Sequence, residues 1–324
     1  MASSPWTSNN IPNQRDNVAV VTGGNSGIGY EAALALASKG ARVILAVRNA
    51  EKGQAAVTAI QRAHPGAIAE IMALDLSNLS SVRRFAETFL QRFETLQLLI
   101  NNAGVMALPF GRTADGFEMQ FGTNHLGHFA LTGLLMPAIL ATPGARVVVV
   151  SSGVHTAGTI DFDNLDGTKS YSRWRAYSQS KLANLLFAYE LQRRFTAASV
   201  DAITAGCHPG WAATNLQSAG ARMDGSRFSE LLSDIANRLF AQSAAMGALP
   251  TLYAATAAEV NGCDYIGPTS LFGLRGAPGK IKSSQRSYDP AVAARLWQVS
   301  EQLTGVYYDL TAQRHGISTA EPAG

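Results

Sequence analysis

Short, continuous runs of apolar residues alternate with longer helical patterns, and this alternation constrains the fold more than any other feature. Because each run is apolar throughout, we expect strands that are buried on both faces. Strands that alternate with helices form a parallel sheet with right-handed crossovers. The sequence therefore predicts an α/β fold: a single doubly wound (Rossmann) domain with helices on both faces of a parallel sheet. The expected strands are Val18–Thr22, Val43–Val47, Ile68–Leu74, Leu96–Asn101, Arg146–Ser151 and Ala202–Cys207.

The strand and helix patterns cover one main domain, and a short segment at each end of the chain lies outside it. We expect a flexible segment over 1–16, the domain over 17–312 and a flexible tail over 313–324. Apolar residues near helical spacing between Phe228 and Phe240 predict a substrate lid at about 215–250, with a membrane-touching helix as the alternative. The expected helices are Ile28–Lys39, Ala50–Ala63, Ser77–Phe93, Thr113–Leu140, Tyr177–Phe195 and Pro290–Leu303, and a last short strand is expected at Tyr265–Phe272.

Composition excludes several classes of protein. With 47% apolar residues and a net charge of +3, the 324-residue chain is neither disordered nor basic enough to imply a nucleic-acid partner. Its two cysteines, Cys207 and Cys263, need no disulfide framework and no Cys/His pair has zinc spacing, so we expect a cytoplasmic protein without a structural metal. Residues 1–17 lack the apolar core of a signal peptide, and no run is long enough to span a membrane.

A glycine cluster, Gly23, Gly27 and Gly29 with Asn25, Ser26 and Ile28 between them, follows the first strand and opens the first helix. Glycines allow the backbone to approach a pyrophosphate, and a helix N-terminus supplies free N–H groups and a positive dipole end. The spacing G-x-x-x-G-x-G differs from the common dinucleotide fingerprint, so a plain glycine-rich turn is the alternative. At this position in the fold, the cluster favours a dinucleotide site.

The second strand is followed by Arg48, and no carboxylate stands at its end. An acidic residue there would hold the ribose 2′-hydroxyl of NAD, whereas an arginine can pair with the 2′-phosphate of NADP. The sequence therefore favours NADP(H) as the cofactor, with NAD(H) as the alternative. A solvated surface arginine is the other interpretation of Arg48.

Two further segments lie where the adenosine half would bind. Asp75 and Leu76 follow the third strand and could bond the adenine, although Asp75 could instead cap the helix near Ser77. Asn102, Ala103 and Gly104 close the fourth strand, where small residues suit a wall against the ribose and equally suit a turn.

Tyr177 and Lys181 are four residues apart and share one face of a predicted helix. A free tyrosine has a pKa near 10, and a nearby ammonium would lower that pKa and make Tyr177 a better acid/base. Ser152, after the fifth strand, could bind a substrate oxygen, and Asn124 could connect Lys181 to water. Ser151 is the competing serine. A bare Y-x-x-x-K is common, so the pair carries weight only in this context.

These motifs together resemble the short-chain dehydrogenase/reductase family. The resemblance rests on TGGNSGIG, NNAG, the asparagine of TNHLGHF, VSS and YSQSK in this order, and it covers residues 17 to about 215. The segments VILAVRN, TNHLGHFALT, VVVVSSGVH and YSQSKLANLLFAYEL are similar to the retinol-dehydrogenase-like branch. That branch typically uses NADP(H), acts on apolar alcohols or carbonyls, and carries an insertion between the serine and the tyrosine. The gap from Ser152 to Tyr177 is 25 positions here.

The resemblance implies a role for each matching residue. Tyr177 would be the general acid/base, Lys181 its tuner and a ribose ligand, Ser152 the residue that orients the substrate oxygen, and Asn124 the end of a proton relay. The Pro209–Gly210 segment and Thr214 would hold the nicotinamide carboxamide. The basic residue that some NADP-using members have in the glycine loop is absent, because Ser26 stands there. Arg48 therefore carries most of the NADP prediction.

The sequence thus predicts an NADP(H)-dependent oxidoreductase for a small apolar aldehyde, ketone or alcohol, including retinol-like compounds. The alternatives are a non-enzymatic NADP(H) sensor and a reductase of conjugated double bonds. The resemblance also implies a homo-oligomer, a dimer or a tetramer, because the family commonly pairs through the helices that carry Asn124 and Tyr177. The Ala/Leu-rich face of Leu182–Leu191 would allow such pairing. His125 and His128 are interpreted as packing or hydrogen-bonding residues rather than ligands, and Cys207 as a core residue.

Overall fold

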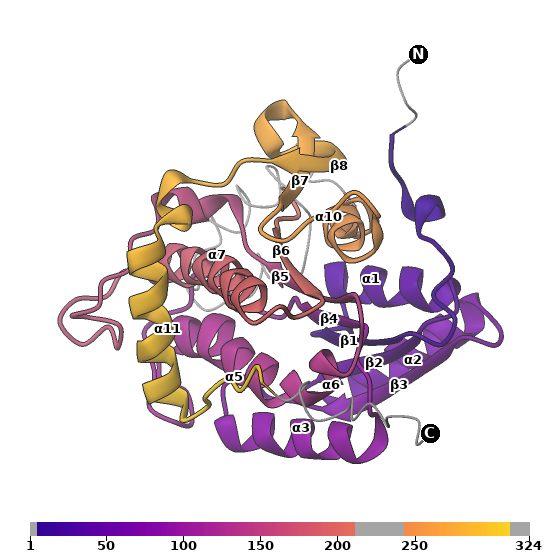
Figure 1. The fold of residues 1–324 in the computed structure, drawn as a ribbon, viewed down its shortest axis with the longest axis horizontal. Coiled ribbons are helices and arrows are strands. Elements are labelled where there is room, and N and C mark those ends of the chain that lie inside the picture. The colour runs from indigo at the N-terminus through magenta and orange to yellow at the C-terminus, as the bar shows by residue number, and fades with distance from the viewer. Residues whose placement is uncertain (1–4, 211–242, 312–324) are drawn as a thin grey trace, which may run out of the picture.

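One mixed sheet organises the part of the chain that the structure, a computed structural model, describes: residues 5–210 and 243–311. Its strands follow the order β3-β2-β1-β4-β5-β6-β7-β8, parallel from β3 to β7, with β8 antiparallel to β7 (Figure 1). This order confirms the predicted doubly wound sheet. The strands are β1 (Val18–Thr22), β2 (Arg42–Val47), β3 (Ile68–Ala73), β4 (Leu98–Asn101), β5 (Ala145–Val150), β6 (Ala202–Cys207), β7 (Tyr265–Ser270) and β8 (Arg275–Ile281).

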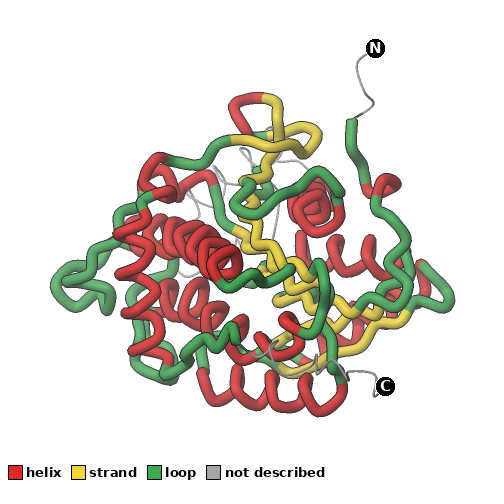
Figure 2. The backbone as a smooth tube through the Cα atoms, viewed as in Figure 1, coloured by secondary structure: helices red, strands yellow, loops and turns green. Residues whose placement is uncertain are grey.

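Helices cover both faces of the sheet (Figures 1 and 2). One face packs against α1 (Gly27–Ser38), α2 (Ala50–Ala63) and α10 (Ala244–Thr256). The other face packs against α3 (Leu79–Arg92), α5 (Gly127–Leu134), α6 (Met136–Leu140) and α7 (Arg173–Ala197). Strands such as β1 are buried at every position because each face has its own apolar core.

The long helical region predicted over Thr113–Leu140 begins only at Met119, and the structure divides it into several pieces. A short α4 (Met119–Phe121) leads into a wider π-helical turn, η2 (Gly122–Leu126), and then into α5 and α6. The π turn begins at Gly122, where a Cβ would lie 2.5 Å from the Thr113 side chain, so the close packing there requires glycine. Pro137 at the start of α6 lacks the N–H that a continuous helix would need. Asn124 therefore lies in a π turn, a feature frequent at functional sites.

The C-terminal region also differs from the expectation. The last strand is followed by β8, whose Gly276, Pro278 and Gly279 make the sequence look like a loop. Residues from Ala244 onward, the end of the expected lid, form the buried helix α10. The rest of the expected lid, with Thr214 and the Phe228–Phe240 stripe, lies outside the described residues, as does the tail over 313–324.

Residues 5–16, expected to be flexible, pack against the domain where the structure describes them. Ile11 is buried, and the ring of Trp6 lies 5.3 Å from that of Tyr253 on α10. Short 3-10 helices punctuate this and later connections: η1 (Ser8–Asn10), η3 (Gly153–Ala157), η4 (Leu271–Gly273) and η5 (Gln285–Tyr288).

Helix α11 (Pro290–Thr304) lies across α7 and beside α5 (Figure 1). Trp297 on α11 stacks with Phe187 on α7 at 5.9 Å, and both side chains are buried. The Leu182–Leu191 face that we expected to be available for pairing is thus covered by the chain's own helix.

Within residues 5–210 and 243–311, no helix combines the length and the apolar character needed to cross a bilayer. The same residues contain no group of three or more His, Cys, Asp and Glu side chains arranged to hold a metal ion.

Candidate active site

The carboxyl ends of the parallel strands meet at one edge of the sheet. Strand β1 lies between β2 and β4, so the strand order reverses direction there. In open α/β sheets, ligands bind in the crevice outside this reversal point. Every sequence-predicted site residue among the described residues belongs to a loop or helix that starts at this edge or packs against it.

The glycine cluster forms a tight turn between β1 and α1. Gly23 and Gly27 have positive φ angles of 67° and 54°, which favour glycine. A Cβ on Gly29 would lie 2.5 Å from both the Gly23 carbonyl oxygen and Asn102 Nδ2, so only glycine fits there. The N-cap Ser26 makes no side-chain bond to the first turn of α1. The first N–H groups of α1 are therefore available to an anion, and these residues fit a dinucleotide pyrophosphate.

Thr22 joins this loop to the segment after β4. Its Oγ1 accepts hydrogen bonds of 2.9 Å from the backbone N–H groups of both Asn102 and Ala103. The Asn102 side chain donates back to the Thr22 carbonyl at 2.8 Å. A Cβ on Gly23 would lie 3.1 Å from the Ala103 Cβ. The structure thus brings the two predicted cofactor-binding segments together as one surface.

Arg48 and Asp75 end neighbouring strands at this edge. Arg48 is exposed just beyond β2. Asp75 Oδ1 accepts from the Ser77 backbone N–H at 3.0 Å and from its hydroxyl at 2.6 Å. Helix α3 is capped by Asn78 instead, so the helix-cap alternative for Asp75 is wrong. Leu76 is buried beside them.

Tyr177 lies on the first turns of α7 and is 4% exposed. Burial raises the pKa of its hydroxyl to about 12, while a hydrogen bond with Ser152 acts to lower it. The expected lowering of this pKa by Lys181 is not seen in this geometry, where burial is the dominant cause and the bond with Ser152 acts against it. Ser151 donates to the Lys181 carbonyl at 2.7 Å, so Ser152 is the serine that meets Tyr177.

Lys181 is completely enclosed one turn further along α7. Its Nζ donates to the Val150 carbonyl at 3.2 Å and lies 5.8 Å from the centre of the Tyr177 ring. Burial lowers the pKa of Lys181 to about 8. The ammonium thus faces a backbone carbonyl behind Tyr177, which explains why it contributes little to the phenol.

Asn124 faces Lys181 across the segment after β4. Its side-chain amide pairs with both backbone groups of Val105, at 2.8 and 2.9 Å, and donates to Ser180 Oγ at 2.9 Å. A Cβ on Gly104 would lie 3.1 Å from Asn124 Oδ1 and 3.4 Å from Lys181 Nζ. Gly104 therefore lets these two residues converge. Val105 and Ser180 were missed from the sequence, although Ser180 lies inside the YSQSK motif.

The segment after β6 lies at the same edge. Gly210 has a positive φ of 68°, and its N–H donates to His208 Nδ1 at 3.2 Å. Pro209 lies between them, next to the crevice that the resemblance assigns to nicotinamide. His208 itself is buried against the Tyr265 ring.

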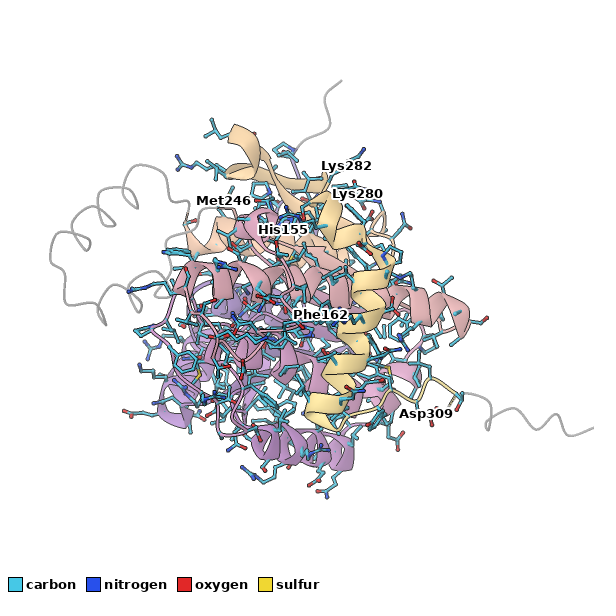
Figure 3. The ribbon with its side chains drawn as sticks, turned by 90° about the vertical axis from the view of Figure 1, so that its left-hand side faces the viewer. His155, Phe162, Met246, Lys280, Lys282 and Asp309 are labelled. Carbon is cyan, nitrogen blue, oxygen red and sulfur yellow. The ribbon has the colours of Figure 1, made fainter. Side chains whose placement is uncertain are left out.

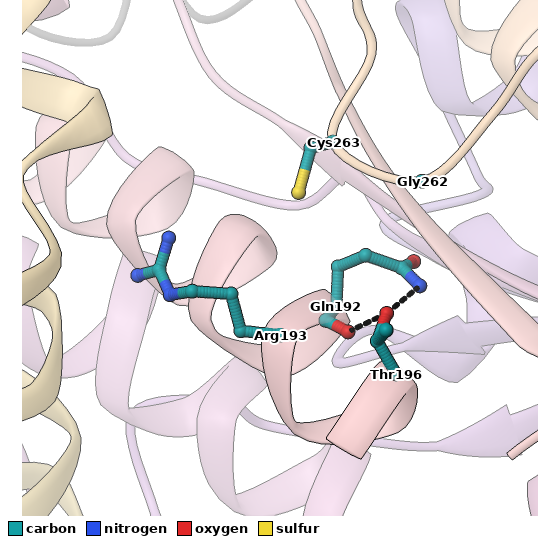
Figure 4. Close-up of a pocket in the computed structure, with 5 residues that line it drawn as sticks. All are labelled: Gln192, Arg193, Thr196, Gly262 and Cys263. Carbon is teal, nitrogen blue, oxygen red and sulfur yellow. Dashed lines mark hydrogen bonds between the residues drawn. The ribbon is translucent and has the colours of Figure 1, made fainter. Parts of the chain in front are cut away.

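A separate cavity of about 440 Å³ lies near the other end of α7 (Figure 4). It is lined by Gln192, Arg193, Thr196, Gly262 and Cys263. Gln192 lies 15 residues after Tyr177, so about 22 Å of helix separates this cavity from the reaction end. We assign it no part in the chemistry.

Fold and site together define a dinucleotide-binding protein with a Ser–Tyr–Lys arrangement at the crevice. The profile of the short chain dehydrogenase family matches residues 17–224, and the chain belongs to this family. Among curated relatives, human retinol dehydrogenase 12 is 41% identical over 90% of this chain and 87% of its own length. Zebrafish (Danio rerio) polyprenol dehydrogenase is 39% identical over 91% and 89%.

Solved structures agree with this assignment. A crystal structure of an uncharacterised protein from Mycobacterium paratuberculosis has a TM-score of 0.78 and 42% identity, covering 94% of this chain and all of that one. The Pseudomonas aeruginosa RhlG/NADP active-site complex has a TM-score of 0.59 at 21% identity, a likeness of fold, and covers 78% of this chain and 94% of that one. The chain is therefore an oxidoreductase of the short-chain dehydrogenase family, similar to retinol dehydrogenases.

Proposed function

We propose that this protein uses NADP(H) to interconvert a carbonyl and an alcohol on a small apolar substrate. The observation that carries the proposal is the Ser152–Tyr177 hydrogen bond, with Lys181 and Asn124 behind it. The substrate oxygen would lie between the Ser152 hydroxyl and the Tyr177 hydroxyl. When bound, the nicotinamide supplies or accepts the hydride.

The chain's own residues manage the proton. Because burial keeps Tyr177 protonated, its hydroxyl can donate to a carbonyl oxygen as that oxygen gains negative charge. In the oxidation direction, Tyr177 would first release its own hydroxyl proton to solvent, and the resulting phenolate oxygen would then take the proton from the alcohol. Ser152 orients the substrate oxygen by a second hydrogen bond, and Lys181 with the backbone near Gly104 would hold the ribose.

An exposed aromatic surface beside Tyr177 supports an apolar substrate. Trp174 is 52% exposed, and its ring meets the Tyr177 ring edge-on at 6.2 Å. A large flat side chain that stays exposed beside the reacting hydroxyl offers an apolar wall. The retinol and polyprenol named for the two relatives are apolar alcohols, which agrees with this wall.

The test of this proposal is Tyr177→Phe, assayed by NADPH oxidation with a panel of apolar aldehydes and ketones. We expect kcat to fall by about 10²- to 10⁴-fold, because the general acid is lost. The NADPH Kd, measured by fluorescence titration, should stay within about twofold, since the aromatic ring remains. Full turnover by the variant would refute the assigned role of Tyr177.

Cofactor preference rests on Arg48 and is tested separately. We expect wild type to bind NADPH more tightly than NADH, and Arg48→Glu to lose at least about tenfold in NADPH affinity because a carboxylate repels the 2′-phosphate. Glu51→Gln, one turn further along, is the matched control and should leave NADPH binding unchanged. Equal affinity for both cofactors in wild type and variant would contradict this preference.

A further inference from the structure

Four of the chain's histidines are buried around the crevice: His125, His128, His155 and His208. Two of them contact backbone carbonyls of residues assigned to the reaction. His128 Nδ1 lies 2.9 Å from the Asn124 carbonyl oxygen, and His155 Nδ1 lies 2.7 Å from the Ser152 carbonyl oxygen. The other two touch neither carbonyl.

Each of these two rings also reaches a distant segment through its second nitrogen. The Ser284 backbone N–H donates to His155 Nε2 at 3.0 Å. Thr22 Oγ1, at the entrance to the glycine loop, lies 2.9 Å from His128 Nε2. Figure 3 shows His155 under the β7–β8 pair, near the strand that leads to Ser284.

The partners decide which nitrogen carries the proton. A carbonyl can only accept, so Nδ1 must be the N–H in both rings. The Ser284 N–H can only donate, so His155 Nε2 must be the acceptor. Thr22 Oγ1 already accepts two N–H bonds, and its own hydrogen has two acceptors within reach, the Ile100 carbonyl at 3.3 Å and His128 Nε2 at the shorter distance of 2.9 Å. The same tautomer is thus required twice.

The environment keeps both rings neutral. Burial lowers the pKa of His155, and burial together with Lys181 lowers the pKa of His128 to about 4. A neutral ring donates to the carbonyl without adding a positive charge beside Lys181. A lysine or arginine could donate there only by burying a further cation.

We propose that His128 and His155 are positioning residues that hold the backbone of Asn124 and Ser152 through Nδ1–H donors, each anchored at Nε2 by a remote segment. His128 ties Asn124 to the cofactor loop through Thr22. His155 ties Ser152 to the chain that leads into η5. This inference rests on the proposed function for its kinetic consequence, but the tautomers are a property of the protein alone.

The other two buried histidines supply internal controls. His125 Nε2 lies 2.9 Å from Ser300 Oγ, whose hydrogen already goes to the Leu296 carbonyl, so this ring must carry Nε2–H. His208 Nδ1 accepts the Gly210 N–H, which again leaves the hydrogen on Nε2. The structure therefore divides the four rings into two pairs with opposite tautomers.

The first experiment is long-range ¹H–¹⁵N correlation of the histidine rings in the wild-type protein at pH 7, assigned with His128→Asn and His155→Asn. We expect Nδ1–H at His128 and His155, and Nε2–H at His125 and His208. Nε2–H or a protonated ring at His128 or His155 would overturn the inference. This result is independent of turnover, so it stands or falls separately from the proposed function.

The second experiment separates positioning from general stability. Replacing either histidine with Asn keeps an N–H donor near the position of Nδ1, whereas replacing it with Leu keeps the side-chain volume but removes the donor. We expect His155→Leu to lower kcat by roughly 10- to 100-fold with the NADPH Kd unchanged, and His155→Asn to recover most of this loss. His128→Leu should weaken NADPH binding as well, because its anchor is the cofactor loop. Equal kcat losses in the Asn and Leu variants would show a role in packing alone.

Discussion

The two ends of the crevice are built in different ways. At the nucleotide end, function rests on backbone geometry: the turn at Gly23, the crowded Gly29 and the uncapped start of α1. At the reaction end it rests on enclosed side chains, where burial shifts the pKa of Tyr177 to about 12 and that of Lys181 to about 8. A site for a fixed phosphate geometry needs shape, whereas a site for proton transfer needs control of charge.

The largest expected effect concerns the reaction end, where the buried Lys181 ammonium should lower the free energy of unfolding. Because the pKa of Lys181 is lowered to about 8, the unfolded chain binds an extra proton between that pH and the ordinary pKa near 10.5. Wild-type stability therefore gains from rising pH across this window. Lys181→Met removes the cost of burying the ammonium, about 3 kcal/mol below pH 8.

The measurement is urea unfolding of wild type and Lys181→Met from pH 6.5 to 10. Other titrating groups cancel in the difference between the two proteins. We expect the free energy of unfolding of the variant, relative to wild type, to decline steadily as pH rises from about 8 towards 10.5. Lys280→Met, an exposed lysine paired with Asp264, is the matched control. A difference independent of pH would contradict a buried, destabilised ammonium.

The next effect tests the backbone end. Gly29→Ala places a Cβ 2.5 Å from the Gly23 carbonyl and the Asn102 side chain. We expect about 1–3 kcal/mol of lost stability from this overpacking, with weaker NADPH binding as the loop shifts. Gly153→Ala, where a Cβ would meet nothing within 4 Å, is the control. If Gly29→Ala leaves both the thermal unfolding midpoint and the NADPH Kd unchanged, the glycine loop accommodates the added Cβ and the predicted overpacking is refuted.

The smallest effect is expected at the reaction end, at the exposed Trp174 ring beside Tyr177. Trp174→Ala should raise KM for apolar carbonyls by roughly fivefold, because about 1 kcal/mol of aromatic contact is removed, while the NADPH Kd stays constant. Leu303→Ala, an exposed apolar residue on α11, serves as the comparison. If KM for apolar and polar substrates changes equally, the ring does not form an apolar wall.

The same contrast explains what the sequence could predict. The continuous apolar runs and the glycine spacing are local patterns, so the strand order and the cofactor loop could be expected from them. The choice of Ser152 rather than Ser151 as the partner of Tyr177 comes from the family resemblance alone. The direction of the Tyr177 pKa could not be predicted, because it depends on how completely α7 is covered by other elements.

Three structural features escaped prediction for tertiary reasons. The π turn at Asn124 lies within a region of continuous helical pattern, which gives no local sign of it. Strand β8 contains two glycines and a proline, and only pairing with β7 makes it a strand. The histidine tautomers depend on Thr22 and Ser284, which lie 106 and 129 residues from their rings.

Helix α11 has a consequence for the order in which the protein is made. The ribosome synthesises α5 and α7 well before residues 290–304. Phe129 and Phe187 therefore lack their packing partner Trp297 until α11 has been made. At a few residues per second, that interval lasts many seconds. An aromatic surface exposed for so long invites chaperone binding or aggregation of nascent chains. If translation is stalled just before Pro290, we therefore expect the glycine loop and its strands to be folded while α5 and α7 still lack the cover of α11.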